Sequence, residues 1–545
     1  MASAATHDVF NQSPPFAGIN LFSSDPALGA LVEGLPQVVI DQLVEHGAQW
    51  GTPETFELGR IANATSPALR SFDANGVRID SVEFHPAYHA LMRRSVQTGL
   101  QCSVWDAAGE ESDVRAVARA ARLYMTAEVD VGHLAAMTLT NASVAALAQT
   151  PKLADIWLPR IRTRRYDSAQ RSLTAKSGGL IGAGFTEKQG GADLGANTTA
   201  AVESGDGLWR ITGHKWFLTA PASDAYLVLA QTVDGLSCFL VPRYLQDDTL
   251  NGVRVMRLKQ TLGWRSAAIA EAEFDEAAGW LIGESGQGAL AIADMQTLTR
   301  LDASVVAAGV MRLALAEAVH HARHRKAFAL ALIDQPLMTR VLADMALDAV
   351  AAAALAFRLA ESYDRAADDP AEAAFARLMT PAVKYWVTKV APGMIGEAME
   401  AMGGNAYSEE SRLPRLYRDA PGLSLGEAGG NVMALEVMRV LRKGSEPLEV
   451  VLANIEDALG STAKSTLNVL RAATAVALAD EGSARILTEQ LAMTVAAAAL
   501  RRRFPSVVAD AFIETRLGKP WRSTYGMLDS RFDAQAFVNY LCPEG

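Results

Sequence analysis

The feature that most constrains the fold is a change of residue pattern in the middle of the chain. From about Pro26 to Arg165 apolar residues recur at helical spacing, as in the segment 115–125, where arginines stand between them. Between Gly178 and Gly288 glycines become frequent, and short β-rich runs replace this periodicity. After Gly288 long segments rich in alanine and leucine return. The order of helices, then strands, then helices predicts an α+β protein that is mainly α-helical.

Four runs inside the central segment have the β-branched and aromatic content typical of strands. Asp206-Gly207 and Asp234-Gly235 lie between such runs, where a hairpin turn needs residues that tolerate a positive φ. The predicted strands are Trp209–Thr212, Lys215–Leu218, Ala225–Ala230 and Ser237–Val241. The changes of pattern divide the chain into four expected domains: a helical domain at 1–177, a β domain at 178–288, a helical bundle at 289–444 and an extra helical domain at 445–545.

The bulk composition argues against several classes of protein. With a net charge of −11, the 545-residue chain is not a globally basic nucleic-acid binder. No apolar run reaches the ~18 residues that suggest a membrane span, and the first twenty residues lack the pattern of a signal peptide. Cys102, Cys238 and Cys542 are far apart, so neither a disulfide framework nor a structural zinc site is indicated. We therefore expect a cytoplasmic protein without a bound metal and without a membrane partner.

A polar, glycine-rich segment at residues 185–199 is the first candidate binding site. It contains Thr-Glu-Lys-Gln-Gly-Gly-Ala-Asp from Thr186 onward, followed by Asn-Thr-Thr from Asn197. A threonine hydroxyl and a pair of glycines offer hydrogen-bond donors and allow a flat ligand to approach the backbone. The candidate binding residues are Phe185, Thr186, Gly191 and Ala192. Taken alone, the same residues could form a polar turn that leads into a strand.

The second candidate is the segment Gly-His-Lys-Trp-Phe-Leu-Thr at 213–219. Adjacent side chains on a strand point to opposite faces. One of the two aromatic side chains, Trp216 or Phe217, could therefore fill the core of the β domain while the other packs beside a flat ligand. Core packing of both is the alternative. The candidate binding residues here are Trp216, Phe217, Leu218 and Thr219.

Five motifs in order resemble those of the acyl-CoA dehydrogenase family. Thr-Glu-x-x-Gly-Gly-x-Asp at 186–193 and Gly-x-Lys-Trp-Phe at 213–217 resemble the family's flavin-binding middle domain. Arg-x-x-Phe at 325–328, Gly-Gly-x-Ala-Tyr at 403–407 and the glutamate-bearing segment 425–431 follow in the family's order. Five ordered matches over nearly 250 residues make the resemblance specific.

The resemblance narrows to the AidB branch of the family, flavoproteins of the adaptive response to DNA alkylation. It rests on segments 7–12, 58–60, 84–89 and 412–418 in addition to the motifs above. It covers most of residues 7–443 and is weak beyond them.

This resemblance implies the acyl-CoA dehydrogenase fold: a helical N-terminal domain, a middle β-barrel domain and a C-terminal helical bundle, here with an extra helical C-terminal domain. It also implies FAD as the cofactor and a homotetramer. Arg325 and Phe328 would reach the FAD pyrophosphate of a neighbouring subunit, and Gly403 and Gly404 would lie near its adenosine end. Two further residues complete the cofactor-binding set that the resemblance implies, Leu425 and Asn431.

The catalytic residue that the resemblance implies is Glu427. The family's glutamate removes a proton α to a thioester carbonyl while the β-hydrogen leaves as hydride to flavin N5. The expected substrate is a small molecule such as an acyl-CoA, and an electron-transfer partner would reoxidise the flavin. The alternative is that Glu427 only caps the helix that begins near Asn431, where a helix dipole favours an acidic side chain.

Several residues depart from the family's pattern. Gly426 stands where members carry a bulky aromatic residue, and Ala428 stands where a glycine follows the glutamate. Ala192 replaces a serine that helps to hold the cofactor, and Ala329 and Ala406 replace glycines. Because the missing aromatic at Gly426 should open space beside the flavin, we expect a bulkier or different substrate. A flavoenzyme that acts on a non-CoA substrate is therefore one alternative function.

Another alternative is a DNA-associated protective flavoprotein with little turnover, because AidB-type proteins are linked with DNA through a basic C-terminal region. Residues 441–545 contain twelve basic and twelve acidic side chains, and the one dense basic cluster is Arg501-Arg502-Arg503. Binding to DNA needs several uncompensated cations along one phosphate track. We therefore expect DNA binding less than dehydrogenase activity. His320, His321 and His324 stand beside arginines that would repel a metal ion, so we interpret them as part of an exposed or interface helix face.

Overall fold

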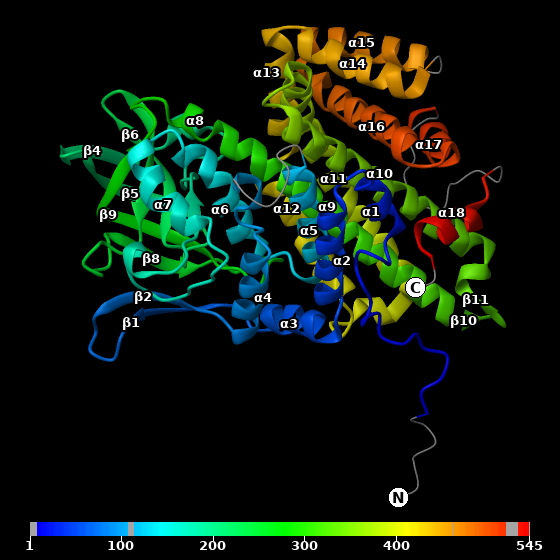
Figure 1. The fold of residues 1–545 in the computed structure, drawn as a ribbon, viewed down its shortest axis with the longest axis horizontal. Coiled ribbons are helices and arrows are strands. Elements are labelled where there is room, and N and C mark those ends of the chain that lie inside the picture. The colour runs from blue at the N-terminus through cyan, green and yellow to red at the C-terminus, as the bar shows by residue number, and fades with distance from the viewer. Residues whose placement is uncertain (1–7, 107–113, 461–462, 519–531, 544–545) are drawn as a thin grey trace, which may run out of the picture. The chain divides into compact units, whose positions relative to one another are not determined.

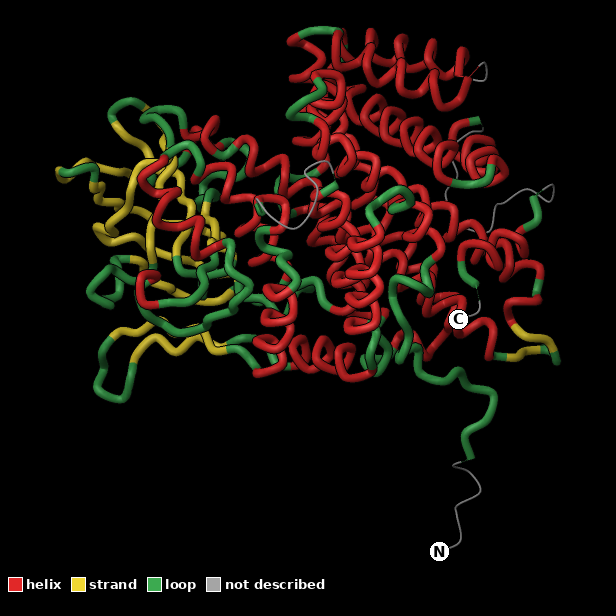
Figure 2. Tube along the Cα trace, viewed as in Figure 1, coloured by secondary structure: helices red, strands yellow, loops and turns green. Residues whose placement is uncertain are grey.

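The computed structural model describes residues 8–106, 114–460, 463–518 and 532–543 (Figure 1). These divide into two compact units. The first comprises residues 1–53, 116–128 and 303–545, and the second comprises residues 54–115 and 129–302. Within the described residues, nearly all the strands belong to the second unit, whereas the first unit is helical (Figure 2). This agrees with the predicted α+β fold that is mainly α-helical.

The strands of the second unit close into a barrel. β5 pairs with β9, β9 with β7, and β7 with β6. β3 and β4 each pair with both β6 and β5, which closes the ladder, and β8 pairs with β9. The strands are β3 (Ile181–Gly184), β4 (Ala200–Gly205), β5 (Leu208–Thr219), β6 (Ala225–Thr232), β7 (Gly235–Pro242), β8 (Val253–Leu258) and β9 (Ile269–Ile282). This closed ladder confirms the middle β-barrel.

The residues of the barrel explain its local structure. The four predicted strand runs all lie in strands, two of them within the long strand β5. Asp206 and Gly207 both have a positive φ in the β4–β5 turn, as hairpin geometry requires. The inside is filled by apolar side chains such as Ile211, Val228 and Phe239, which are fully buried. A second apolar cluster, which includes Ile181 and Leu227, packs the barrel against α6 and α7.

The helices of the second unit lie beside this barrel, together with a hairpin that the sequence pattern did not reveal. The helices are α3 (Pro53–Ala64), α4 (Pro86–Gln97), α6 (Leu134–Leu147), α7 (Pro151–Ile161) and α8 (Gly288–Ala291). The hairpin joins β1 (Ala68–Phe72) to β2 (Arg78–Glu83) within a stretch expected to be helical. Its turn is set by Asp73, whose carboxylate accepts hydrogen bonds from two backbone N–H groups. Asp80 fastens β2 to the barrel by accepting a hydrogen bond from the backbone N–H of Val255 in β8.

The first unit is a bundle of long helices. Two of them, α10 (Pro336–Arg365) and α11 (Pro370–Met402), pack against each other along their length. The others up to residue 443 are α1 (Pro26–Leu31), α2 (Gln37–Trp50), α5 (Arg115–Val129), α9 (Ala293–His324, which begins in the second unit), α12 (Leu413–Leu425) and α13 (Gly430–Lys443). By length and composition alone α9 could cross a membrane, but 83% of its apolar window is buried inside the protein. It has the character of a core helix.

The C-terminal region continues the bundle with further helices. Three of them lie side by side in Figure 1 and contact one another: α14 (Glu446–Leu459), α15 (Ala463–Ala479) and α16 (Ala484–Arg503). α16 also packs on α10 and α11. α17 (Ser506–Phe512) runs into a π-helical turn, where buried Arg516 pairs with Asp344 and Asp348 of α10. The last helix is α18 (Ala534–Leu541), which contacts α10 and α1.

Candidate functional site

The loop at 185–199 lies directly beside β5. The backbone N–H of Trp216 donates a hydrogen bond to the carbonyl oxygen of Thr186 at 2.8 Å. The two segments that the sequence joined into one candidate site are therefore neighbours in the fold.

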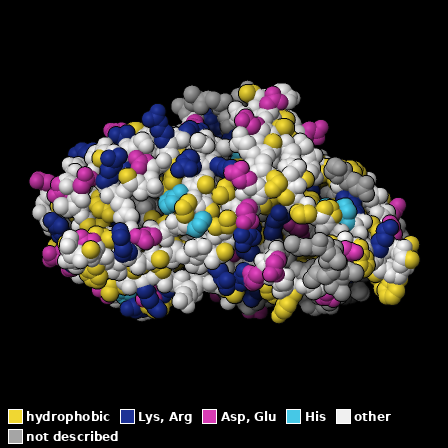
Figure 3. Space-filling model, turned by 90° about the horizontal axis from the view of Figure 1, so that it is seen from below, with side chains coloured by type: hydrophobic (Ala, Val, Ile, Leu, Met, Phe, Trp, Pro, Cys, Tyr) yellow, Lys and Arg dark blue, Asp and Glu magenta, His cyan; other side chains and the backbone are white. Residues whose placement is uncertain are grey.

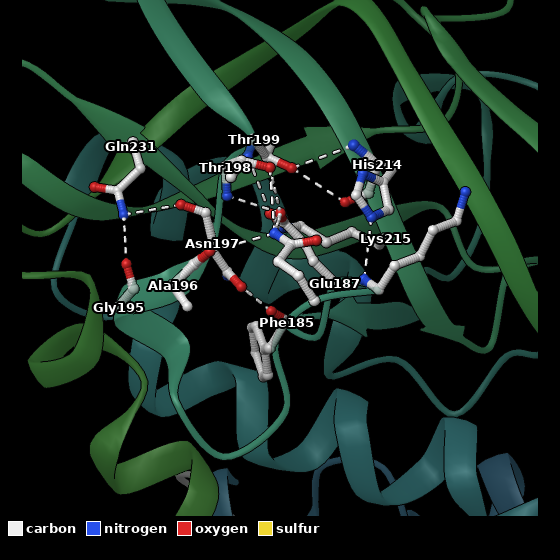
Figure 4. A network of polar contacts seen from close by, with 12 residues as sticks. Phe185, Glu187, Gly195, Ala196, Asn197, Thr198, Thr199, His214, Lys215 and Gln231 are labelled. Carbon is white, nitrogen blue, oxygen red and sulfur yellow. Dashed lines mark hydrogen bonds and ion pairs between the residues drawn. The ribbon is translucent and has the colours of Figure 1, made fainter.

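A buried ion pair fixes this loop to the strand (Figure 4). The ammonium group of Lys215 lies 2.6 Å from the carboxylate of Glu187, and both side chains are fully buried. The same carboxylate accepts hydrogen bonds from the backbone N–H groups of Thr198 and Thr199 and from the Thr198 hydroxyl. Glu187 thus holds both ends of the loop, and its position in the motif is explained by structure and not by contact with a ligand.

Burial and hydrogen bonding act on this pair in opposite directions. Burial alone would raise the pKa of Glu187, but hydrogen bonds from Lys215, Thr199 and Thr198 outweigh it and leave that pKa well below its ordinary value. Burial lowers the pKa of Lys215 to about 8, although Glu187 acts to raise it. Both groups are charged at neutral pH, so the pair remains intact there.

Further contacts set the rest of the loop (Figure 4). The Asn197 side-chain amide donates to the carbonyl oxygen of Phe185, and the Thr199 hydroxyl bonds with both backbone groups of His214. A Cβ on Gly213 would come within 2.5 Å of the Thr199 hydroxyl oxygen, so only glycine allows this approach. The loop is therefore rigidly seated on β5 through its polar residues.

The two aromatic residues of β5 differ from the expectation. Between Lys215 and Leu218 the register of β5 against β9 shifts by one residue, from Lys215–Ala272 to Leu218–Ala270. This bulge turns Lys215 and Leu218 inward, whereas Trp216 is half-buried and Phe217 is 43% exposed. Neither ring fills the barrel core, so the interpretation with one ring in the core and the alternative with both rings there were both wrong. Simple strand alternation fails at a bulge.

Both aromatic rings face one cation instead. The ammonium group of Lys259 lies 3.2 Å from the centre of the Trp216 ring and 4.9 Å from that of Phe217. The carboxylate of Glu271 binds this lysine and also Arg257. Lys188 and Arg257 also lie over the Trp216 ring, at 5.6 and 5.8 Å from its centre. The ring is therefore surrounded by cations.

The remaining predicted residues of the loop leave room for a flat ligand. Gly191 and Ala192 are exposed, and a Cβ on Gly191 would meet no atom within 4 Å. Asn197 Oδ1 is buried with no hydrogen-bond partner among the described residues. Leu218 is fully buried, and half-buried Thr219 pairs with Ala183 of β3. The open backbone at Gly191 and Ala192 and the partly exposed rings of β5 fit an isoalloxazine ring.

In the first unit, Glu427 lies on a tight turn between α12 and α13. Glu427 and Ala428 both have a left-handed backbone, with φ of 55° and 79°. The ammonium group of Lys384, a buried residue of α11, donates to the carbonyl oxygens of Ser424 and Ala428 at 2.8 and 2.6 Å. Lys384 therefore bridges the two ends of the turn that carries the glutamate.

Neighbouring positions bear on the capping alternative. The N-cap of α13 is Gly429 and has no side-chain cap, so Glu427 lies two residues outside the helix. Leu425 is 74% exposed, and the exposed Asn431 accepts a hydrogen bond from Arg485.

Gly426 has φ −60° and ψ 149°, a conformation open to any residue. Nothing in its backbone therefore requires a glycine.

The Arg-x-x-Phe motif forms a small hairpin, β10 (Lys326–Ala327) and β11 (Leu330–Ala331). Phe328 and Ala329 form its turn, both with positive φ, and Phe328 is 95% exposed. The Arg325 guanidinium donates to the carbonyl oxygen of Asn11. The N-terminal segment, which the motif gave no reason to place here, thus covers part of this arginine.

The glycine motif at 403–407 forms a 3₁₀ turn at the end of α11. Gly403 has φ 69° and ψ −152°, a conformation that only glycine adopts readily, and both Gly403 and Gly404 are exposed. Ala406 is fully buried and does not have a positive φ. Asn405 donates to the side chain of Gln12, so the N-terminal segment reaches this turn as well.

Several residues that the sequence did not identify hold the predicted site residues in place. Glu187 and Lys215 stand inside the quoted motifs, but only the fold shows that they pair. A lysine between apolar positions of a strand was the available signal. Lys384 lies in a helix more than forty residues before Glu427, and Asn11 lies more than three hundred before Arg325. No motif connects such distant positions.

Comparison with known proteins decides the family. Residues 11–168 match the N-terminal domain of the adaptive response protein AidB. Residues 182–277 match the middle domain of acyl-CoA dehydrogenases, and residues 286–441 match their C-terminal domain. The chain is 46% identical to AidB of Escherichia coli over 80% of this chain and 81% of that one. The chain belongs to the acyl-CoA dehydrogenase family. Within the family it is close to AidB, as predicted.

Solved structures of the family agree with the fold. A Caenorhabditis elegans ACDH-11 structure in complex with C11-CoA has a TM-score of 0.81 and is 26% identical, covering 100% of this chain and 95% of its own. The acyl-CoA dehydrogenase family member 11 of the same organism is 30% identical over 83% of this chain and 75% of its own. FAD is the cofactor of this acyl-CoA dehydrogenase-family chain, as predicted.

The charge distribution gives no support to the DNA alternative. Each arginine of the cluster 501–503 pairs with a carboxylate, of Asp510, Asp457 and Glu361 in turn. On the face drawn in Figure 3, basic and acidic side chains are intermingled. Lys519, Arg522 and Arg531 lie outside the described residues.

Within the described part of the chain, no group of His, Cys, Asp and Glu side chains is arranged to hold a metal ion. The ring nitrogens of His320 and His324 contact backbone carbonyl oxygens instead.

Proposed function

We propose that this protein is an FAD-dependent acyl-CoA dehydrogenase in which Glu427 removes the α-proton of the substrate. The observation that carries the proposal is the built turn around Glu427. A family glutamate retained only by descent would not require a buried lysine that binds both ends of its turn. Left-handed backbone at Glu427 and Ala428 has a cost in free energy, and such strain persists where the surroundings hold it in place.

The chemistry divides between cofactor and chain. When bound, FAD accepts the hydride that leaves the substrate β-carbon. Glu427 must be ionised to take the α-proton, and the residue is half-buried on its turn. The polar loop at 185–199 and the rings of β5 would orient the flat ring system and keep water from it.

A homotetramer fits the exposed surface of the first unit. Phe328, Tyr407 and Leu425 are 95%, 85% and 74% exposed. Exposed apolar surface beside a binding site is typical of a contact with another protein surface. Phe328 and Tyr407 belong to the motifs that the family resemblance connects with a neighbour's cofactor, and Leu425 belongs to the segment that carries Glu427. We infer that a second copy of the chain covers them.

Anaerobic mixing with acyl-CoA thioesters of graded chain length tests the function. We expect at least one of them to bleach the flavin absorbance within the mixing experiment. Glu427→Gln should bind FAD normally and abolish the bleaching. Glu436→Gln, which removes a surface partner of Arg439 in α13, is the matched control and should bleach like the wild type. A flavin-loaded protein that no acyl-CoA bleaches would contradict the proposal and favour a non-CoA substrate.

A further inference from the structure

A cavity of about 370 Å³ lies within the second unit, apart from the predicted flavin residues. It is bounded by the β1–β2 hairpin, α4, the start of α6, and the segments before β3 and after β5. None of the residues proposed to bind FAD lines it. Its volume falls within the roughly 300–1,000 Å³ of small-molecule sites. We call it the Ser223 pocket.

The Ser223 hydroxyl is the polar group that the protein itself does not satisfy. Ser223 is 3% exposed, lines the pocket, and has no hydrogen-bond partner among the described residues. A buried hydroxyl left without a partner costs about 1–3 kcal/mol. The Ser223 oxygen has almost no accessible surface in its present rotamer, so the side chain must turn about χ1 to bring the hydroxyl to a bound molecule. A hydrogen bond to that molecule would then remove the cost.

The charges in the lining of the pocket cancel. Three basic side chains face three acidic ones: Arg70, Lys176, Arg243, Glu83, Asp167 and Asp224. Lys176 pairs with Asp224 at 2.6 Å, and Arg70 pairs with Glu83 at 3.1 Å. The Arg243 guanidinium donates to the carbonyl oxygen of Asp80. An ionic ligand would compete with these contacts, whereas a neutral ligand would not.

One wall of the pocket is aromatic. The rings of Phe84 and Tyr88 stack with their centres 4.1 Å apart, and His89 stands edge-on to both. His89 in turn bonds with the hydroxyl of Tyr166 at 2.8 Å. Burial, with Arg93 nearby, lowers the pKa of His89, which keeps this ring neutral. Aromatic rings arranged in this way favour a flat partner.

We propose that the Ser223 pocket is a second ligand site, which takes a small neutral aromatic molecule bearing a hydrogen-bonding group. The Ser223 hydroxyl bonds the polar group, and the wall formed by Phe84, Tyr88 and His89 contacts the ring. This site does not depend on the dehydrogenase reaction, so it holds whether or not acyl-CoA thioesters prove to be substrates.

Calorimetric titration of the FAD-loaded protein with three probes tests the ligand class. Benzamide is flat and neutral, benzoate is flat and charged, and cyclohexanecarboxamide is neutral but not flat. We expect benzamide to bind at least tenfold more tightly than either of the others. Absence of benzamide binding, or equal binding of benzoate, would overturn the proposal.

Two substitutions on one helix locate the binding. Ala135 lines the pocket near the start of α6, so Ala135→Leu should weaken benzamide binding at least tenfold. Ala145→Leu, on the same helix but outside the pocket, should leave it unchanged. If Ala135→Leu fails to fold, Ala222→Phe at an exposed lining position makes the same test. Unchanged benzamide binding in the folded pocket variant would place the ligand elsewhere and refute the site.

Discussion

The ammonium group of Lys384 lies 2.6 Å from the carbonyl oxygen of Ala428, the residue that follows Glu427. Lys384 also binds the carbonyl oxygen of Ser424, so it spans the turn from one end to the other. The lysine itself is 1% exposed. Through these two contacts it holds the turn that carries the Glu427 carboxylate, which makes it a positioning residue.

Lys384→Met should therefore slow the reaction more than it weakens substrate binding. The methionine fills the space but leaves two carbonyl oxygens without their donor, so the turn shifts. Because a displacement of 1 Å can cost about 100-fold in rate, we expect kcat to fall about 10- to 100-fold with KM little changed. Steady-state turnover with an artificial electron acceptor measures both. Arg377→Met, an exposed change on the same helix, should alter neither kcat nor KM. If Lys384→Met lost FAD, or if the Arg377→Met control lost as much activity, the effect would be a general one on folding.

Glycine should be preferred at two of the three positions where this chain has alanine in place of the family's glycine. Ala329 and Ala428 have φ of 67° and 79°, where a Cβ is strained by about 1 kcal/mol. Ala329→Gly and Ala428→Gly should each raise the free energy of unfolding by about that amount. Ala406 does not have a positive φ and is fully buried, so Ala406→Gly should lower it. Denaturant titration measures the free energy of unfolding of the three variants, and a stabilising Ala406→Gly would contradict the prediction.

The Glu187–Lys215 pair should make the stability of the second unit sensitive to acid. Because the pKa of Glu187 is lowered in the folded state, the unfolded state binds more protons below its ordinary pKa of 4.5. The stability from this carboxylate is thus present above about pH 4.5 and is lost as the pH falls below it. Glu187→Gln should flatten that part of the stability profile.

The same variant should be less stable at neutral pH, by about 3–5 kcal/mol, since it leaves Lys215 buried without its partner. Adding Lys215→Met should recover much of that loss. Denaturation midpoints between pH 3 and pH 7, roughly the range in which carboxylates titrate, provide the measurement. Glu203→Gln, at an exposed position of β4, is the control. An acid slope that survives in Glu187→Gln would show that other carboxylates produce it.

Gly426→Trp should change the preference among substrates without unfolding the turn. The φ and ψ of Gly426 suit any residue, so the substitution adds side-chain volume without backbone strain. We expect bulky acyl groups to lose reactivity by tenfold or more relative to short ones, since a single pocket contact is worth about 1–3 kcal/mol. Competition between two acyl-CoA thioesters reports the ratio. Unchanged selectivity and turnover would mean that the glycine does not shape the substrate space.

Local patterns in the sequence were enough to predict the barrel strands and the helix–strand–helix order. The alternation of side chains in a strand and turn residues such as Asp206-Gly207 determine the backbone over only a few positions, and the strands and this turn occur in the fold as predicted. The β1–β2 hairpin escaped because its strands are short and partly polar, and a contact between Asp80 and distant Val255 stabilises it. The bulge at Trp216 escaped because no residue there signals an extra position in the strand.

In the candidate site, too, local motifs predicted some residues and distant contacts in the fold placed the others. Thr186 and Trp216 could be joined from their motifs, and the backbone bond between them agrees. The residues that hold the site, Glu187 with Lys215 and Lys384 beneath the glutamate turn, depend on contacts across long stretches of chain. Their pairing becomes visible only in the fold, where these residues are buried.

Titration of FAD into the apoprotein, followed by quenching of flavin fluorescence, tests the central claim that the 185–199 loop and β5 form the flavin cradle. We predict saturation at one FAD per chain and at least tenfold weaker binding in Trp216→Ala, whose half-buried ring can be removed without opening the core. Phe72→Ala, an exposed aromatic change on the β1–β2 hairpin, should bind as the wild type does. An apoprotein that takes up no FAD, or a Trp216→Ala variant that binds it with wild-type affinity, would contradict the account.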